Sequence, residues 1–196
     1  MAMHEPLTPP ASELLPKLAR QQADRRQAGG RGRLLLVLAT FAQPPDNPDT
    51  GDGMVEVLHA AIMDRLRNSV RGEDLVLRRD RRDFLMALVD CLPEQAALRL
   101  SIVLQAVGER PIEVEGNSIP VVLIAGAATV EDDLADDVAA QRVAIDLALS
   151  RATSALAAAR VRGSLDSLLL FDGVETVVDH PLVVGRRPPA LPVSSN

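Results

Sequence analysis

Short apolar runs alternate with longer helical patterns along this chain, and the alternation limits the folds that it can adopt. The run LLLVLATF at 34–41 is short, continuous and apolar, which is typical of a strand covered on both faces. LVLRR and FLMALV, joined by an Asp/Arg turn, predict a hairpin. IPVVLIAGAATV at 119–130 predicts a central strand in which Gly126 marks a bend or a close backbone contact, and SLLLFD at 167–172 predicts a final strand.

Helical periodicity fills the intervals between these runs. Residues 11–33 predict a surface helix that stops at Gly29 and Gly30. A helix over 94–107 has Leu98, Val103 and Val107 at apolar positions, and an alanine-rich helix follows the acidic loop EDDLADD and reaches about Arg162. The helix before the hairpin has one apolar face, formed by Val55, Leu58, Ile62, Leu66 and Val70. The order α-β-α-β-β-α-β-α-β predicts an α/β layered domain with a mixed sheet.

Composition narrows the class of protein further. Hydrophobic residues make up 47% of the 196 residues but aromatic ones only 2%, so the core is aliphatic. A net charge of −6 argues against a general nucleic-acid binder, which needs a broad cationic face. The single cysteine, Cys91, excludes an internal disulfide and a cysteine-cluster metal site. The start lacks a signal-peptide pattern and no apolar run reaches the roughly 20 residues of a membrane span, so we expect a cytoplasmic protein.

Several short strings occur in an order and spacing that resemble the GGDEF (diguanylate cyclase) domain family. They are EPLT at 5–8, RGED at 71–74, DRRDF at 80–84, IAGAA at 124–128 and ATSALAAARVRG at 152–163. The resemblance covers nearly the whole chain. It implies a nucleotide-cyclase-like fold, with a mixed five-stranded sheet flanked by helices on a ferredoxin-like βαββαβ core. We therefore expect a GGDEF-like domain over 1–173 and a Pro-rich, extended or disordered tail over 174–196.

The signature turn departs from the family pattern at the positions that carry the chemistry. The family joins two GTP molecules across a homodimer, with divalent metals held by carboxylates of the first strand and of the acidic third signature position. Those positions here are Val37 or Ala39, and Arg82. The segment that replaces GG[D/E]EF consists of Asp80, Arg81, Arg82, Asp83 and Phe84. The resemblance thus implies a degenerate member with no catalytic residues, no metal site and no cofactor.

Other nucleotide contacts of the family are also altered. The lysine that follows the first strand corresponds to Ala42, and the helix lysine corresponds to Arg160. Asn47, Asp49 and Asp52 lie in the loop where the family has nucleotide contacts. The alternative is that this is an ordinary Pro-rich, acidic loop without such contacts. The cluster Arg78, Arg79, Arg81 and Arg82 is either an anion site or a solvated turn that Asp80 and Asp83 partly neutralise.

RGED retains the pair that binds cyclic di-GMP in the family, away from the active site. An arginine fork donates to guanine O6 and N7, while a carboxylate accepts from the guanine amino and imino groups. Arg71 and Asp74 stand at these positions. The family often adds an arginine from the next helix; that position is Ile102 here, and Arg99 lies one turn earlier. Arg71, Asp74 and Arg99 are therefore the candidate cyclic di-GMP-binding residues.

Three functions remain open at this point. The leading hypothesis is a catalytically inactive regulatory module of cyclic di-GMP signalling that recognises a protein partner and binds cyclic di-GMP as a ligand; a homodimer is compatible with it. The alternative is a weakly active cyclase or GTP-binding domain in which Asp46 or Asp49 recruits the metal. The third is a purely structural interaction domain with no small ligand. His4, His59 and His180 are too scattered to predict zinc or acid–base chemistry, and Cys91 predicts a buried small side chain.

Overall fold

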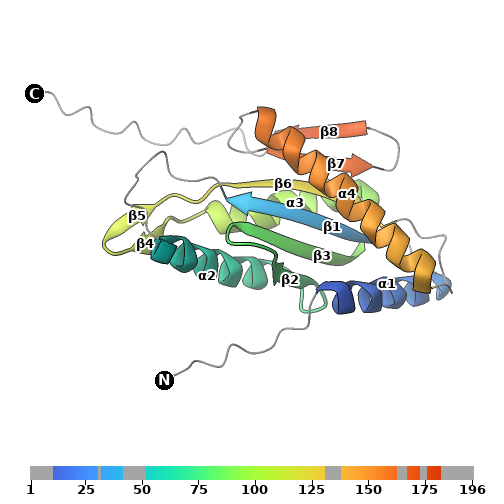
Figure 1. Ribbon diagram of the computed structural model, residues 1–196. Coiled ribbons are helices and arrows are strands. Elements are labelled where there is room, and N and C mark those ends of the chain that lie inside the picture. The colour runs from blue at the N-terminus through green and yellow to red at the C-terminus, as the bar shows by residue number, and fades with distance from the viewer. Residues whose placement is uncertain are drawn as a thin grey trace, which may run out of the picture.

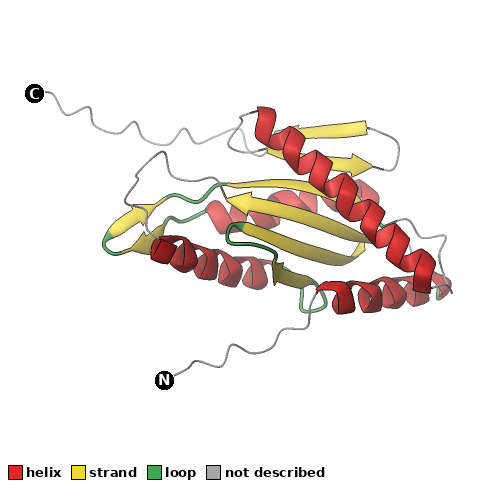
Figure 2. Ribbon diagram, in the orientation of Figure 1, coloured by secondary structure: helices red, strands yellow, loops and turns green. Residues whose placement is uncertain are grey.

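The computed structural model describes residues 11–30, 32–41, 52–130, 138–162, 167–172 and 176–181. Helices alternate with strands or hairpins along these residues, as Figures 1 and 2 show. In chain order the elements are α1 (Ala11–Gln27), β1 (Arg33–Phe41), α2 (Asp52–Ser69), β2 (Leu75–Arg78), β3 (Asp83–Cys91), α3 (Pro93–Gly108), β4 (Ile112–Val114), β5 (Asn117–Ile119), β6 (Leu123–Thr129), α4 (Val138–Arg162), β7 (Ser167–Asp172) and β8 (Thr176–Pro181).

The main sheet is mixed, which confirms the predicted fold class. Its strand order is β2-β3-β1-β6-β7-β8. Strands β6 and β7 run parallel, and α4 is the crossover between them; the other neighbouring pairs are antiparallel. The prediction had five strands, and the sixth is β8, which pairs with β7 inside the segment 174–196 that was predicted as a tail. Residues 182–196 of that segment lie outside the described residues.

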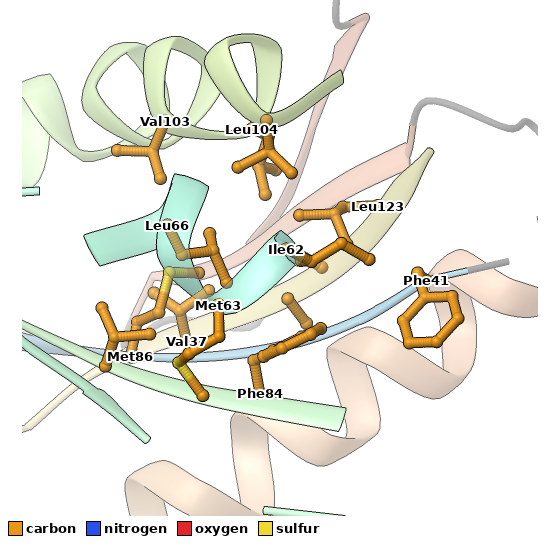
Figure 3. Close-up of a cluster of buried hydrophobic side chains, with 14 of the residues drawn as sticks. Val37, Phe41, Ile62, Met63, Leu66, Phe84, Met86, Val103, Leu104 and Leu123 are labelled. Carbon is orange, nitrogen blue, oxygen red and sulfur yellow. The ribbon is translucent and has the colours of Figure 1, made fainter. Parts of the chain in front are cut away.

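Strand β1 lies in the middle of the sheet and is covered on both faces, as its apolar sequence predicts. Leu35, Val37 and Ala39 belong to a core cluster with residues of α2 and α3. Leu34, Leu36 and Leu38 belong to a second cluster with residues of α1 and α4. The domain therefore has three layers, with two helices on each face of the sheet. Figure 3 shows the first cluster, in which side chains of β1 and β3 meet those of α2 and α3.

Gly126 sets how closely α4 approaches the sheet. A Cβ atom built at this position would overlap the backbone nitrogen of Leu156 and the carbonyl oxygen of Ala152. The helix backbone thus occupies the space that any side chain on Gly126 would need. This confirms the close backbone contact predicted from a glycine inside an apolar strand.

A small two-stranded sheet, β4–β5, was not predicted. Its two-residue turn consists of Glu115 and Gly116, which both have positive φ angles of 50° and 80°. Two successive left-handed residues are the mark of a type I′ hairpin turn, for which glycine at the second position is well suited. The predicted strand over 119–130 is correspondingly divided, because Ile119 ends β5 and only Leu123–Thr129 enters the main sheet.

Two further predictions concern surface properties. Leu98, which the sequence placed at an apolar helix position, is 60% exposed on α3. It therefore belongs to the solvent side of that helix and not to the core. Among the residues that the structure describes, none of the helices has the length and apolar content that crossing a membrane requires.

Candidate functional site

The turn between β2 and β3 carries the charges that replace the family signature. The Asp80 side chain accepts the backbone N–H of Arg81 at 2.7 Å, the local bond that makes Asp common in turns. The N–H of Asp80 donates to the carbonyl oxygen of Asp83 at 3.2 Å, which closes the loop. The carbonyl oxygen of Arg82 accepts the N–H of Phe41 at 3.4 Å. The turn is thereby held beside the end of β1.

Ion pairs connect this hairpin to helices on both faces of the sheet. Arg78 donates to both carboxylate oxygens of Glu56 on α2, at 2.7 and 2.6 Å. Asp83 lies 3.3 Å from the guanidinium of Arg160 on α4. All four side chains are partly or largely exposed, so solvent screens both pairs and they add little to stability. Arg160, which corresponds to the helix lysine of the family, thus contacts Asp83 of the turn.

The residues that the sequence resemblance aligns with the family's metal positions have side chains that do not fit a divalent cation. Val37 and Ala39 are fully buried in the cluster with α2 and α3, and they offer no oxygen ligand. Arg82 brings a positive charge to the third position of the turn. Hard cations are bound by several oxygen atoms, above all carboxylates. Within the described ranges, no three His, Cys, Asp or Glu side chains gather into a group that could hold a metal ion.

The RGED segment lies against a β-bulge at the other end of β3. The register pairs Arg33 with Cys91 and Leu35 with Leu88, so two residues of β3, Val89 and Asp90, stand opposite one residue of β1. A bulge of this kind leaves backbone groups without a ladder partner. The N–H of Val89 donates instead to the side chain of Asp74, at 2.9 Å.

Asp74 is the centre of this region. Its side chain is completely buried, with 0% exposed surface. One carboxylate oxygen accepts the N–H of Val89; the other accepts the N–H of Arg71 at 2.8 Å and the guanidinium of Arg99 at 2.6 Å. Arg99 donates a further bond to the carbonyl oxygen of Val89, at 3.0 Å. The structure thus brings together all three residues that the sequence nominated. The buried Asp74 lies between the other two: it accepts the backbone N–H of Arg71 and the guanidinium of Arg99.

The three candidate residues differ in how they meet solvent. Arg71 is exposed at the end of α2, whereas the Arg99 side chain is 16% exposed. Ile102, at the family's arginine position, is 57% exposed and apolar. Val89 lies six positions after Asp83 along β3, so the signature turn and the RGED region are about 20 Å apart at roughly 3.3 Å per residue. They are two separate regions.

Contacts from α1 to the RGED region were not predicted. Gln22 is buried; its amide nitrogen donates to the carbonyl oxygen of Gly32 at 2.9 Å, and its amide oxygen accepts the N–H of Asp90 at 2.7 Å. Arg25 pairs with Glu73 at 2.7 Å, and this hydrogen bond lowers the pKa of the Glu73 carboxyl. Neither contact could be predicted, since Gln22 and Arg25 lie in the polar part of a helix predicted to be on the surface.

His59 and Cys91 are both buried. The His59 ring stacks on Phe84 with centroids 4.5 Å apart, and its Nε2 has no hydrogen-bond partner among the described residues. Burial lowers the pKa of His59, the nearby Arg78 lowers it further, and Glu56 acts in the opposite direction. Cys91 is a buried small side chain, as predicted, and burial raises the pKa of its thiol.

Several nominated residues fall outside what the structure describes. Ala42, Asp46, Asn47 and Asp49 lie between residues 41 and 52, and His4 lies before residue 11. For Asp52 and His180 only the backbone is described, in α2 and β8. The alternative metal ligands Asp46 and Asp49 therefore remain predictions.

Solved structures with the same architecture were found by comparison. The diguanylate cyclase SiaD from Pseudomonas aeruginosa, solved in complex with its activator SiaC, superposes with a TM-score of 0.62 at 19% identity over 85% of this chain, which spans 61% of the SiaD chain. The FimX GGDEF domain from the same organism gives 0.60 at 22% identity, covering 80% of this chain and 89% of that domain. The GGDEF domain of DgcB from Caulobacter crescentus, in complex with c-di-GMP, gives 0.61 at 11% identity over 89% and 97% of the two chains.

These likenesses establish a GGDEF-like fold. No protein-family model and no curated protein matched the chain. The neighbours are GGDEF domains of proteins of cyclic di-GMP signalling, and the likeness to them extends over most of the chain.

Proposed function

We propose that this GGDEF-fold chain is a regulatory module of cyclic di-GMP signalling that lacks cyclase activity and acts through a protein partner. The observation that carries the proposal is the chemistry of the metal positions: Val37 and Ala39 are buried and apolar, and Arg82 is cationic. Phosphoryl transfer to a nucleotide hydroxyl relies on bound cations to neutralise developing charge. A cation in place of a carboxylate ligand repels the metal that this chemistry needs.

The signature turn supports the same proposal on steric grounds. Glycines allow the backbone to approach a nucleotide closely. Asp80 and Arg81, which are both exposed, add side chains at these two positions. The bonds of Asp80 to Arg81 and to Asp83 keep the turn folded without glycine. The scaffold is thus kept while the space for the nucleotide is reduced.

Incubation of the purified chain with GTP and either Mg²⁺ or Mn²⁺ tests the loss of activity. We expect no cyclic di-GMP and no loss of GTP by chromatography. A matched variant, Arg82→Glu, restores an acid at the third position of the turn and is expected to remain inactive, because Val37 and Ala39 still supply no ligand. Turnover by the unaltered chain that disappears in Asp46→Asn or Asp49→Asn would instead establish the alternative of a weakly active enzyme.

A protein partner is supported by one of the structural neighbours. SiaD, which shares the fold, was solved bound to a protein activator. Affinity purification of the full chain tests for such a partner. Arg25→Ala is studied beside it, because this variant removes the ion pair between α1 and Glu73 of the RGED loop. We expect a stoichiometric complex by size-exclusion chromatography. A chain that never forms a complex with another protein would remove this part of the proposal.

Cyclic di-GMP binding is a second function, favoured by the meeting of Arg71, Asp74 and Arg99 at the end of β3. A carboxylate offers about four acceptor sites, and Asp74 already uses three of them within the protein. Recognition of guanine must therefore depend mainly on the exposed Arg71, whose fork fits guanine O6 and N7. Arg99, which is partly exposed and adjacent, contributes positive charge toward the phosphates.

Calorimetry with cyclic di-GMP separates this receptor function from a purely structural role. We expect binding by the unaltered chain that Arg71→Ala abolishes and Arg110→Ala preserves. Arg110 is a suitable control because it is an equally exposed arginine beyond the far end of α3. Asp74→Ala is unsuitable, since Asp74 supports the fold. No binding by the unaltered chain, or equal loss in both variants, would eliminate the receptor function and leave the structural interaction domain.

A further inference from the structure

The outer side of α4 exposes apolar residues. Its inner side is buried against the sheet, largely through alanines, with Ile145 and Leu156 as the bulky residues. On the opposite side Val143 is 67%, Leu147 44% and Val161 87% exposed. α4 lies across one face of the sheet with its outer side turned away from it (Figure 1).

The exposed residues on this side form one continuous line. We call it the outer stripe: Val143, Leu147, Ser150, Ser154, Ala157 and Val161, all of them exposed. Their spacing is four, three, four, three and four residues. That is the spacing of the two core positions in a heptad repeat, which keeps side chains on the seam between two paired helices. The small residues at the middle of the stripe allow two helix backbones to approach closely.

Two hydroxyl groups, one on the outer stripe and one beside it, already donate hydrogen bonds within the helix. Ser154 donates to the carbonyl oxygen of Ser150 at 3.2 Å, and Thr153 donates to that of Leu149 at 2.8 Å. Burying a hydroxyl is unfavourable mainly when it loses its hydrogen bond to water without a replacement. Because these two hydroxyls keep their bonds, covering them costs little free energy.

The helix is also held in place before any association. Short isolated helices form poorly in water, and the packing of one face normally supplies their stability. The inner side of α4 supplies that packing here, and at Gly126 the helix backbone contacts the strand directly. Pairing through the outer stripe therefore needs no additional folding of α4.

Charges beside the outer stripe are complementary to those of a second, parallel copy. In a parallel coiled coil, the residue just before core position a of each heptad faces the residue five positions further along the partner helix. Leu147 is at such a core position. Asp146 would thus face Arg151 of the second copy, and the symmetry repeats this opposite-charge pair. An antiparallel pair that aligns the same stripe would place Arg151 against its own copy, which is repulsive.

We propose that the outer stripe of α4 is the interface of a homodimer, in which the two α4 helices pair in parallel about a two-fold axis. This goes beyond the proposed function and does not depend on it. One pair of helices buries less surface than a permanent interface. The dimer is therefore reversible and forms at the higher protein concentrations.

Sedimentation velocity of the full chain over a range of concentrations tests the dimer. We expect the weight-average sedimentation coefficient to rise with concentration. Leu147→Glu places two like charges across the seam and should keep the chain monomeric. Leu98→Glu is the matched control, because Leu98 is exposed to a similar degree on α3, on the opposite face of the sheet. A chain that is monomeric at every concentration, or a loss of dimer in Leu98→Glu alone, overturns the proposal.

Cysteine cross-linking tests the parallel arrangement independently. In a parallel pair Ser150 faces Ser150 of the second copy, so Ser150→Cys should give a disulfide-linked dimer on mild oxidation. Ser118→Cys, exposed on β5, should not. The native Cys91 is buried and can remain. Equal cross-linking at both positions, or none at Ser150, rules out the parallel seam. Absence of cross-linking at Ser150 is the result expected if another protein, or residues 182–196 of the same chain, covers α4 instead.

Discussion

Replacing Asp74 by alanine should destabilise the protein far more than its position in a loop suggests. The change removes an acceptor from three donors: the N–H groups of Val89 and Arg71 and the guanidinium of Arg99. The Val89 N–H lies in a bulge, so losing its partner costs about 1–3 kcal/mol. Removing one member of a buried ion pair costs about 3–5 kcal/mol.

The Arg99 environment places the expected loss below the sum of these two costs, near the lower end of the ion-pair range. The guanidinium keeps its bond to the carbonyl oxygen of Val89 and has 16% of its side chain exposed, so water compensates part of the lost pair. We expect Asp74→Ala to lower the free energy of unfolding by about 3 kcal/mol, against a typical total of about 5–15 kcal/mol. Asp74→Asn should recover only part of the loss, because its NH2 group would face at least one of the three donors and the charge that pairs with Arg99 is gone.

Urea unfolding followed by circular dichroism measures this effect. The chain has no Trp or Tyr, so intrinsic fluorescence is not a suitable signal. Asp80→Ala is the control: Asp80 is exposed in its turn, and we expect a change within about 0.5–1 kcal/mol. The slope of the transition should stay constant across the variants. If Asp74→Ala loses less than about 1 kcal/mol, or no more than Asp80→Ala, the account of Asp74 as a support of the fold is wrong.

Two further predictions concern the strand–helix contact and the buried histidine. Gly126→Ala should lower the free energy of unfolding by more than about 2 kcal/mol, since its Cβ meets helix backbone, while Gly72→Ala, whose Cβ would meet open space, should be close to neutral. Thermal unfolding of the two variants in parallel measures this, and equal stabilities would contradict it. Burial lowers the pKa of His59, so the unfolded chain takes up a proton more readily and stability should fall as the pH drops through about 6.5. His59→Gln should flatten that part of the stability–pH profile, and an unchanged profile would show that other groups cause it.

Apolar patterning predicted the main elements well because each has one dominant physical requirement. The run at 34–41 had to be covered on both faces, and β1 occupies the middle of the sheet. The glycine within 119–130 required close contact, and α4 provides it. The β4–β5 hairpin was missed because its strands are three residues each and its turn is Glu-Gly, a weaker signal than Asn-Gly. Strand β8 was missed because its neighbourhood is rich in proline, which usually argues against a strand.

The candidate site was predictable only as far as local spacing reaches. Arg71 and Asp74 were nominated because RGED resembles a short motif of the family, and the two residues are joined by a local turn in which the N–H of Asp74 donates to the carbonyl oxygen of Arg71. Arg99 was found by its position on the next helix, and the structure pairs it with Asp74. The internal use of the Asp74 carboxylate was not predictable, because it depends on a bulge in β3 that results from pairing with β1. Gln22 was missed for a related reason: burial of one amide side chain leaves no pattern in a sequence.

The bulge makes two successive amides report on two different parts of the molecule. The N–H of Val89 is held by the loop after α2 through Asp74, and the N–H of Asp90 is held by α1 through Gln22. Neither depends on a neighbouring strand, so each should exchange its hydrogen with solvent when its own side chain releases it and the sheet stays intact. The exchange rates of these two amides would therefore record separately the detachment of α1 and the opening of the RGED loop, and would show whether a ligand or partner loosens one, the other or both.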